Sequence, residues 1–186
     1  MIDRNTAFNW LKQRIQNKNL IKHMVATEAI MRALANKLGH DADKWGLVGL
    51  VHDLDFEETK DRPEQHGLVT EKFLKERGIE DQDIVQAIKS HNAEGTGVPR
   101  AKELDYALTA AEQITGLIVG CALVMPEKKL ASVNKDTVLK KYKQKAFTAN
   151  VDRELIMLCQ KIGFTLEDFV ELSLKSMQLV AGELSL

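Results

Sequence analysis

The stretch Gly46-Leu47-Val48-Gly49-Leu50-Val51-His52-Asp53 joins an apolar run to an adjacent histidine and aspartate. The apolar residues predict the buried end of a helix, and the polar pair follows where that helix stops. Neighbouring side chains in a regular helix diverge by about 100°, so both can face one point only where the chain leaves helical geometry. We therefore expect His52 and Asp53 to project together from the end of a rigid element.

Helical periodicity dominates on both sides of this stretch, and strand-type alternation is nearly absent. The sequence therefore predicts an all-α fold. We expect helices over about residues 6–16, 20–38, 42–52, 63–77, 84–90 and 104–123, and two more near the C-terminus. Expected N-caps are Asn19, Asp41, Asp81 and Thr165. Residues 53–62 and 92–100 are expected to form polar loops.

Length and composition limit the classes of function. The 186 residues are 44% hydrophobic and 28% charged, which is enough to bury a core in one domain over residues 1–186. The net charge of −1 favours neither nucleic acid nor an anionic membrane as a partner. The longest apolar stretch, residues 114–125, is interrupted by Thr115 and two glycines, so no membrane span is expected.

The N-terminal residues contain no apolar segment typical of a signal peptide, and the expected location is the cytoplasm. Cys121 and Cys159 are far apart and lie in apolar contexts. We interpret them as buried, free thiols of a reducing compartment, because no Cys-x-x-Cys pair is present.

The five histidines of the chain are distributed unevenly among these elements. Four occur near expected helix ends or on expected helices beside polar residues: His23, His52, His66 and His91. Imidazole and carboxylate groups are common ligands of Fe, Mn, Co, Ni and Zn. A single histidine on an amphipathic helix is more often a hydrogen-bonded structural residue, but the ordered set favours a metal site. His40, in a polar Gly-His-Asp turn, is expected at the surface.

The order His23, His52-Asp53, His66, His91 and then an acidic residue on an apolar helix resembles the HD-domain superfamily of metal-dependent phosphohydrolases. It is most similar to small, stand-alone bacterial HD proteins. The strings that carry the resemblance are Leu-Val-His-Asp-Leu-Asp at 50–55, His-Gly-Leu-Val at 66–69 and Ala-Ile-Lys-Ser-His-Asn at 87–92. It implies a compact helical bundle over about residues 20–125, followed by a helical extension over about 126–186.

The resemblance also implies a ligand set. His23, His52 and Asp53, together with a distal acid, would bind one metal ion. His66 and His91 would bind a second ion, with Asp53 as the bridging ligand and expected catalytic residue. One or two divalent ions (Fe, Mn, Co, Ni, Zn or Mg) are the implied cofactors.

The distal acid departs from the family pattern. The family usually has Ala-Asp at this point, where this chain has Ala111-Glu112. Glutamate can ligate, but its extra methylene moves the carboxylate by about 1.5 Å, roughly one carbon–carbon bond. A misplacement near 1 Å can cost about a hundredfold in rate. The other interpretation of Glu112 is a charge on a buried helix face, which needs a partner in any case.

A site with two metal ions suits hydrolysis by water of a phosphate monoester, diester or nucleotide anhydride. The expected substrate is a nucleotide or another small phosphorylated molecule. Lys60, Asn92 and Arg100 are candidate substrate-binding residues, although Lys60 and Arg100 also fit solvated surface charges. Among the acids after the dyad, Asp55, Glu57 or Glu58 is a candidate proton donor, although such an acidic loop is mostly solvated.

Three alternatives remain open at this point. A degenerate HD domain would bind metal or nucleotide and regulate a partner, which Glu112 favours. A di-iron oxygenase reaction uses a similar ligand set in a distant branch of the superfamily. The lysines between residues 128 and 145 would suit a phosphate-facing lid or nucleic-acid binding, but such runs are more often a solvated helix face, and few aromatic residues are interleaved with them.

Overall fold

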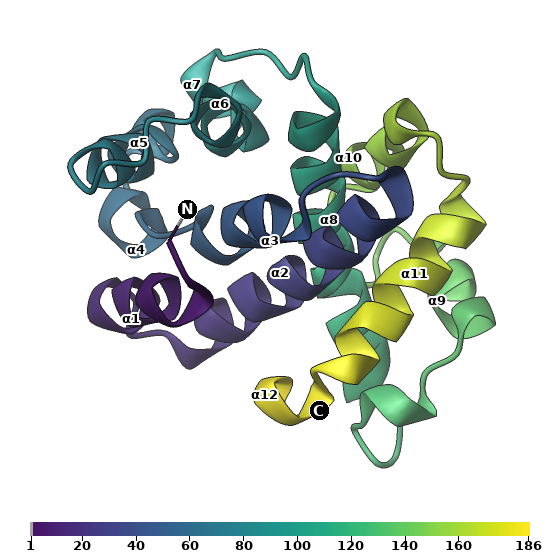
Figure 1. The fold of residues 1–186 in the computed structure, drawn as a ribbon. Coiled ribbons are helices and arrows are strands. Elements are labelled where there is room, and N and C mark those ends of the chain that lie inside the picture. Colours follow the sequence, from purple (N-terminus) through teal and green to yellow (C-terminus); the bar gives the residue numbers. More distant parts are fainter. Residues whose placement is uncertain (1) are drawn as a thin grey trace.

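The computed structural model describes residues 2–186, which form helices and connecting loops without any β-strand (Figure 1). The predicted all-α class is confirmed. The α-helices are α1 (Arg4–Arg14), α2 (Lys18–Leu38), α3 (Ala42–Val51), α4 (Phe56–Thr59), α5 (Leu68–Lys75), α6 (Gln82–His91), α7 (Ala93–Thr96), α8 (Glu103–Leu123), α9 (Lys135–Tyr142), α10 (Arg153–Ile156), α11 (Leu166–Leu179) and α12 (Ala181–Leu184). Three 3₁₀ segments are η1 (Pro63–Gln65), η2 (Leu130–Ser132) and η3 (Met157–Ile162).

Polar side chains at the N-caps set where several helices begin. Asp41, Asp81 and Thr165 accept hydrogen bonds from backbone amides in the first turns of α3, α6 and α11, as predicted. The predicted cap of α2 was wrong by two residues. Asn17 is extended and accepts from the amide of Asn19, so α2 already begins at Lys18.

The centre of the bundle is formed by α2, α3 and α8, with α5 and α6 on one side and α11 on another (Figure 1). The apolar face predicted for α2 is confirmed, since Thr27, Ile30 and Leu34 are buried. Gly49 of α3 permits a close approach to α2, because a Cβ added there would lie 2.9 Å from the backbone nitrogen of Glu28. This contact fixes the end of α3, where His52 follows, against α2.

The two regions predicted as polar loops contain short helices. Within residues 53–62 the chain forms α4, and Leu54, Asp55 and Thr59 are buried rather than solvated. Within residues 92–100 it forms α7.

The helix predicted from Pro63 is also divided. Its first turn is η1, and α5 begins only at Leu68. The break is at Gly67, whose φ of +90° favours glycine and whose added Cβ would lie 2.7 Å from the carbonyl oxygen of Ile88. As a result His66 lies in an extended conformation between the two segments, not within a helix.

Residues 126–186 share the hydrophobic core with the preceding helices. Leu130, Ile162 and Phe169 are among the buried residues of that one cluster. The two helices predicted last correspond to α10 with η3, and to α11, while α9 forms within the lysine-rich stretch and α12 follows α11.

By length and composition α8 alone, among the helices of residues 2–186, could span a membrane. Most of it is buried inside the bundle, however, as in the core helix of a soluble protein. Its apolar side chains are therefore accounted for by packing against α2 and its other neighbours.

Candidate metal centre

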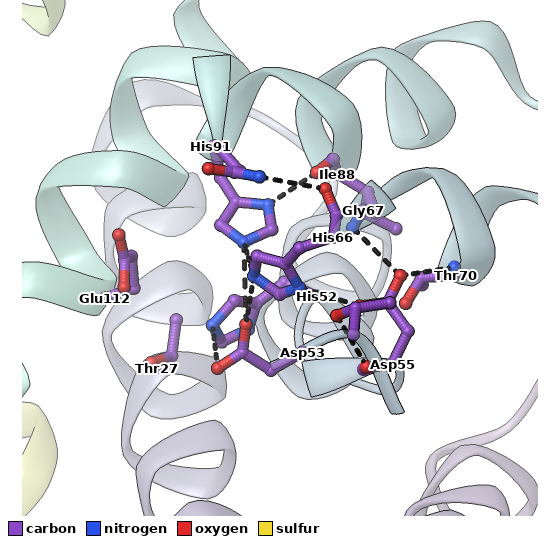
Figure 2. A network of polar contacts seen from close by, with 12 residues as sticks. Thr27, His52, Asp53, Asp55, His66, Gly67, Thr70, Ile88, His91 and Glu112 are labelled. Atoms are coloured by element: carbon purple, nitrogen blue, oxygen red, sulfur yellow. Dashed lines mark hydrogen bonds and ion pairs between the residues drawn. The ribbon is translucent and has the colours of Figure 1, made fainter. Parts of the chain in front are cut away.

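Side chains from five parts of the chain converge on one cluster. They are His23 of α2, the pair His52-Asp53 after α3, His66 between η1 and α5, His91 at the end of α6, and Glu112 of α8. Figure 2 shows all of them except that of His23. The convergence follows from helix ends meeting: α3 and α6 stop where their last turns reach the same point, and the buried faces of α2 and α8 pass beside it.

The carboxylate of Asp53 lies between two pairs of histidines. Its Oδ2 atom is 3.7 Å from Nε2 of His23 and 3.5 Å from Nε2 of His52. Its Oδ1 atom is 3.2 Å from Nε2 of His66 and 3.5 Å from Nε2 of His91. Each oxygen thus faces one pair, which is the arrangement that a bridging carboxylate needs.

The potential ligand atoms fall into two groups, each with its atoms within 4.8 Å of one another. One group contains His23, His52 and Glu112, and the other contains Asp53, His66 and His91. These are the residues that the resemblance divides between two ions, with Asp53 reaching both groups.

Backbone carbonyl groups determine which nitrogen of two histidines carries hydrogen. Nδ1 of His52 lies 2.9 Å from the oxygen of Gly49, and Nδ1 of His91 lies 2.5 Å from the oxygen of Ile88. Because a carbonyl oxygen can only accept, each Nδ1 must donate a proton. The neutral ring then presents an unprotonated Nε2 to the cluster.

Thr115 fixes the orientation of His23 in the same way. Its hydroxyl donates to the carbonyl oxygen of Glu112 at 2.6 Å, so it accepts from Nδ1 of His23 at 2.8 Å. The Nε2 atom of His23 is therefore also free of hydrogen in the neutral ring.

Asp55 holds His66. Its Oδ1 atom lies 2.8 Å from Nδ1 of His66, and its Oδ2 atom accepts the backbone amides of Gly67 and Thr70 at 2.9 and 2.8 Å (Figure 2). Asp55 is completely buried. The sequence identified it only as one of three acids in a mostly solvated loop and as a candidate proton donor. For Asp55 the expected solvent exposure was wrong. A carboxylate behind a metal-binding histidine orients the ring and raises its basicity.

The paired histidines leave a place for a positive charge. Nε2 of His23 is 3.3 Å from Nε2 of His52, and Nε2 of His66 is 2.9 Å from Nε2 of His91. With every Nδ1 committed as a donor, two lone pairs would face each other at these distances and repel, unless a proton or a cation lies with them. Nitrogen and carboxylate donors in this combination fit a borderline transition-metal ion.

The pKa values describe the protonation of the metal-free cluster. Burial lowers the pKa of His52 to about 3, so its ring is neutral. Burial also opposes a charge on His66, but hydrogen bonds to Asp53 and Asp55 outweigh it and raise the pKa of His66 to about 10. For Asp53, burial is outweighed by His52, His66 and His91, which hold its pKa well below the usual range. In the metal-free cluster the ring of His66 is therefore protonated.

Glu112 lies on the His23 side of the cluster. Its Oε2 atom is 4.0 Å from Nε2 of His23, and its Oε1 atom accepts from the side-chain amide of Gln113 at 3.0 Å. Burial raises the pKa of Glu112. The carboxylate thus reaches the site from α8 in spite of its extra methylene, and its role as a ligand stays a prediction.

Two candidate substrate-binding residues are engaged in contacts within the protein. The side-chain amide of Asn92 donates to the carbonyl oxygens of Pro63 and His66 at 2.7 and 3.1 Å. The guanidinium of Arg100 donates to the carbonyl oxygen of His91 at 2.8 Å. It also binds the hydroxyl of Thr109 and the carboxylate of Glu94.

Asn92 and Arg100 are thus hydrogen-bonded to the backbone of the two histidines of the second group. Lys60 is exposed just after α4. A contact of any of the three with substrate stays a prediction.

The histidine expected outside the cluster is confirmed as a surface residue. His40 is exposed, stacks on Trp45 and binds the carboxylate of Glu103 at 2.6 Å. Both cysteines are buried and free, as predicted. Burial raises the pKa of each thiol to about 11.

Comparison with known proteins agrees with this site. The family model described as HD domain matches residues 20–119, which is more than half of the chain. The matched segment contains all four clustered histidines, Asp53 and Glu112. No curated protein and no solved structure matches the chain.

Proposed function

The chain belongs to the HD-domain family, and from this premise we propose that it is a metal-dependent phosphohydrolase that cleaves a nucleotide or another small phosphate ester. The single observation that carries the proposal is the carboxylate of Asp53, with one oxygen toward His23 and His52 and the other toward His66 and His91. His23, His52, Asp53, His66, His91 and Glu112 would hold one or two ions, and such ions would supply the chemistry of hydrolysis.

The donor set favours Fe, Mn, Co, Ni or Zn over Mg, because four imidazole nitrogens accompany the two carboxylates and Mg prefers oxygen ligands. Bound metal supplies a water of lowered pKa as the nucleophile and neutralises charge on the phosphoryl group.

The residues of the chain contribute position and charge. Asp53 stays ionised, as its depressed pKa indicates. The Nδ1 contacts of the histidines keep each Nε2 pointed at one place, and a preorganised site avoids the cost of ordering these side chains during the reaction.

The accessible edge of the cluster is at His23. Its side chain is 24% exposed, compared with 0% for His52 and 4% for His91. We propose that substrate approaches along this edge, past Glu112. Because the thiols of Cys121 and Cys159 are buried, we also propose the reducing cytoplasm as the location.

Metal content and turnover test the proposal together. Purified protein loaded with Mn²⁺ should contain one or two ions per chain and should hydrolyse p-nitrophenyl phosphate or bis-p-nitrophenyl phosphate. Asp53→Asn and His52→Ala should lose both metal and activity. His40→Ala, a matched control outside the cluster, should keep both. A protein that takes up no ion under any loading condition contradicts the proposal.

A second candidate function is a regulatory module that binds metal or nucleotide without turnover. Two observations favour it: Glu112 in place of the usual aspartate, and the ion pair at 2.9 Å that engages Arg100, a candidate substrate-binding residue, with Glu94. Bound metal with no hydrolysis across a panel of nucleotides and phosphate esters would support this function over the first.

A further inference from the structure

A pocket of about 450 Å³ opens beside the metal cluster, between α2, α8 and the segment that follows α11. His23 belongs both to the cluster and to the lining of this pocket. Thr115, which holds Nδ1 of His23, lines it as well. The pocket therefore adjoins the cluster at His23, the one clustered residue in its lining.

The two ends of the pocket differ in chemistry. At the His23 end lies Lys22, whose ammonium forms no ion pair within residues 2–186. The rest of the lining is mainly aliphatic and includes Val119, Leu123 and Leu184, together with the polar side chains of Asn19 and Ser185. Leu123 is 51% exposed although it is large and apolar, so it has unused apolar surface there.

The lining also indicates which organic group would fit. Apart from the imidazole of His23 it contains no aromatic ring on which a nucleobase could stack. From Thr115 to Leu123 the pocket follows α8 for about 12 Å, at 1.5 Å per residue. An apolar wall of this length suits an extended aliphatic chain better than a flat, polar base.

We propose that this pocket binds the aliphatic part of a phosphomonoester, with the phosphate at the Lys22 and His23 end. The inference rests on the proposed function, since it names the class of substrate that the same site would take. It favours an alkyl phosphate over a nucleotide. Burial of its methylenes would hold a chain of this kind. Lys22 and the metal cluster would hold its phosphate.

Binding of non-hydrolysable probes tests the inference separately from catalysis. The Mn²⁺-loaded protein is titrated calorimetrically with ethyl, butyl, hexyl and octyl phosphonate. Kd should fall roughly twofold to fourfold per methylene, fourfold being the value for complete burial at about 0.8 kcal/mol per methylene. Adenosine monophosphate should bind more weakly than the hexyl compound. A Kd that is independent of chain length, no binding by any probe, or a preference for the nucleotide overturns the inference.

Two pairs of variants locate the bound group. Val119→Trp fills the pocket and should flatten the dependence on chain length, while Val124→Trp, the same change at an exposed position that does not line the pocket, should preserve it. Lys22→Ala should weaken all four phosphonates by a similar factor, and Lys18→Ala, one turn earlier on α2, should not. Equal behaviour of Val119→Trp and Val124→Trp would contradict the placement of the chain.

Hydrolysis of the corresponding alkyl phosphates separates the two proposals. Chain-length-dependent binding without hydrolysis would remove the proposed phosphohydrolase function and leave the pocket's ligand class intact. Hydrolysis with the same kcat/KM for ethyl and octyl phosphate would keep the phosphohydrolase and remove the aliphatic substrate.

Discussion

The buried carboxylate of Asp55 lies 2.8 Å from Nδ1 of His66, so the ring that faces Asp53 on one side is held by a second aspartate on the other. Asp55 also accepts the backbone amide of Gly67, at the break before α5, and that of Thr70 in the first turn of α5. Because these contacts fix both the ring and the chain around it, Asp55 would act on a bound metal ion through His66.

We predict that Asp55→Asn lowers metal affinity at the His66 and His91 site by about 10- to 100-fold, as is typical when a partner behind a metal-binding histidine is lost. Competition with a fluorescent chelator measures the effect. Glu64→Gln, which removes an exposed acid of the same region, serves as the control. Equal affinities for Asp55→Asn and the wild type would show that His66 does not need this carboxylate.

Metal uptake should release a proton from His66. In the metal-free protein the pKa of His66 is raised from 6.5 to about 10, so its stabilising charge is fully present below pH 6.5 and is lost as the pH rises through 10. An ion that binds Nε2 must displace this proton, and apparent affinity should therefore increase between pH 6.5 and 9. His52, with a pKa of about 3, contributes no proton in this range.

Calorimetric titration in buffers of different ionisation enthalpy counts the released protons. We expect about one proton per ion at the His66 site at pH 7.5, and the same number for His40→Ala. An affinity that does not change between pH 6.5 and 9, with no proton release, would contradict the assignment of the charge to His66.

The length of the Glu112 side chain can be tested by substitution. In the present arrangement its Oε2 atom is 4.0 Å from Nε2 of His23, and a side chain shorter by one methylene would withdraw from the site. We predict that Glu112→Asp weakens the His23 and His52 site and lowers kcat by up to about a hundredfold, even though it restores the usual family residue. Glu112→Gln should cost more, because it also removes the charge.

Metal titration and steady-state kinetics measure both changes, with Glu103→Asp as the same substitution at the distant end of α8. Improved metal affinity or activity in Glu112→Asp would show instead that the extra methylene is a defect of the site.

The sequence predicted the residues of the cluster better than the contacts that orient them. His52 and Asp53 could be placed because an apolar helix must end where its polar residues begin. Asp41 and Asp81 could be placed by the local chemistry of helix capping. These features depend only on neighbours in the chain.

Asp55 and Thr115 could not be placed in this way, because their roles depend on segments that are distant in sequence. Asp55 meets Gly67 and Thr70, and Thr115 of α8 meets His23 of α2. In the sequence, Asp53 and Asp55 on either side of Leu54 are typical of an acidic loop. The packing of α5 is needed to show that these residues are buried. Likewise, the sequence predicted His66 within a helix, because Pro63 suits the first turn of a helix. In the structure Gly67 separates that turn from α5.

The approach of α3 to α2 gives a prediction for stability. An added Cβ at Gly49 would lie 2.9 Å from the backbone nitrogen of Glu28, which cannot move without shifting α2. Gly49→Ala should therefore lower the free energy of unfolding by about 1–3 kcal/mol, the usual cost of overpacking a core. Urea denaturation of the metal-free protein measures it.

Gly182→Ala is the matched control, because a Cβ there meets nothing within 4 Å, and its stability should be unchanged or slightly higher. Gly49→Ala should also weaken metal binding. His52 follows directly from α3 and His23 lies on α2, so a shift between the two helices would change the 3.3 Å distance between their Nε2 atoms. If Gly49→Ala lost stability but kept full metal affinity, the helix contact would support the fold without setting the distance between these two ligands.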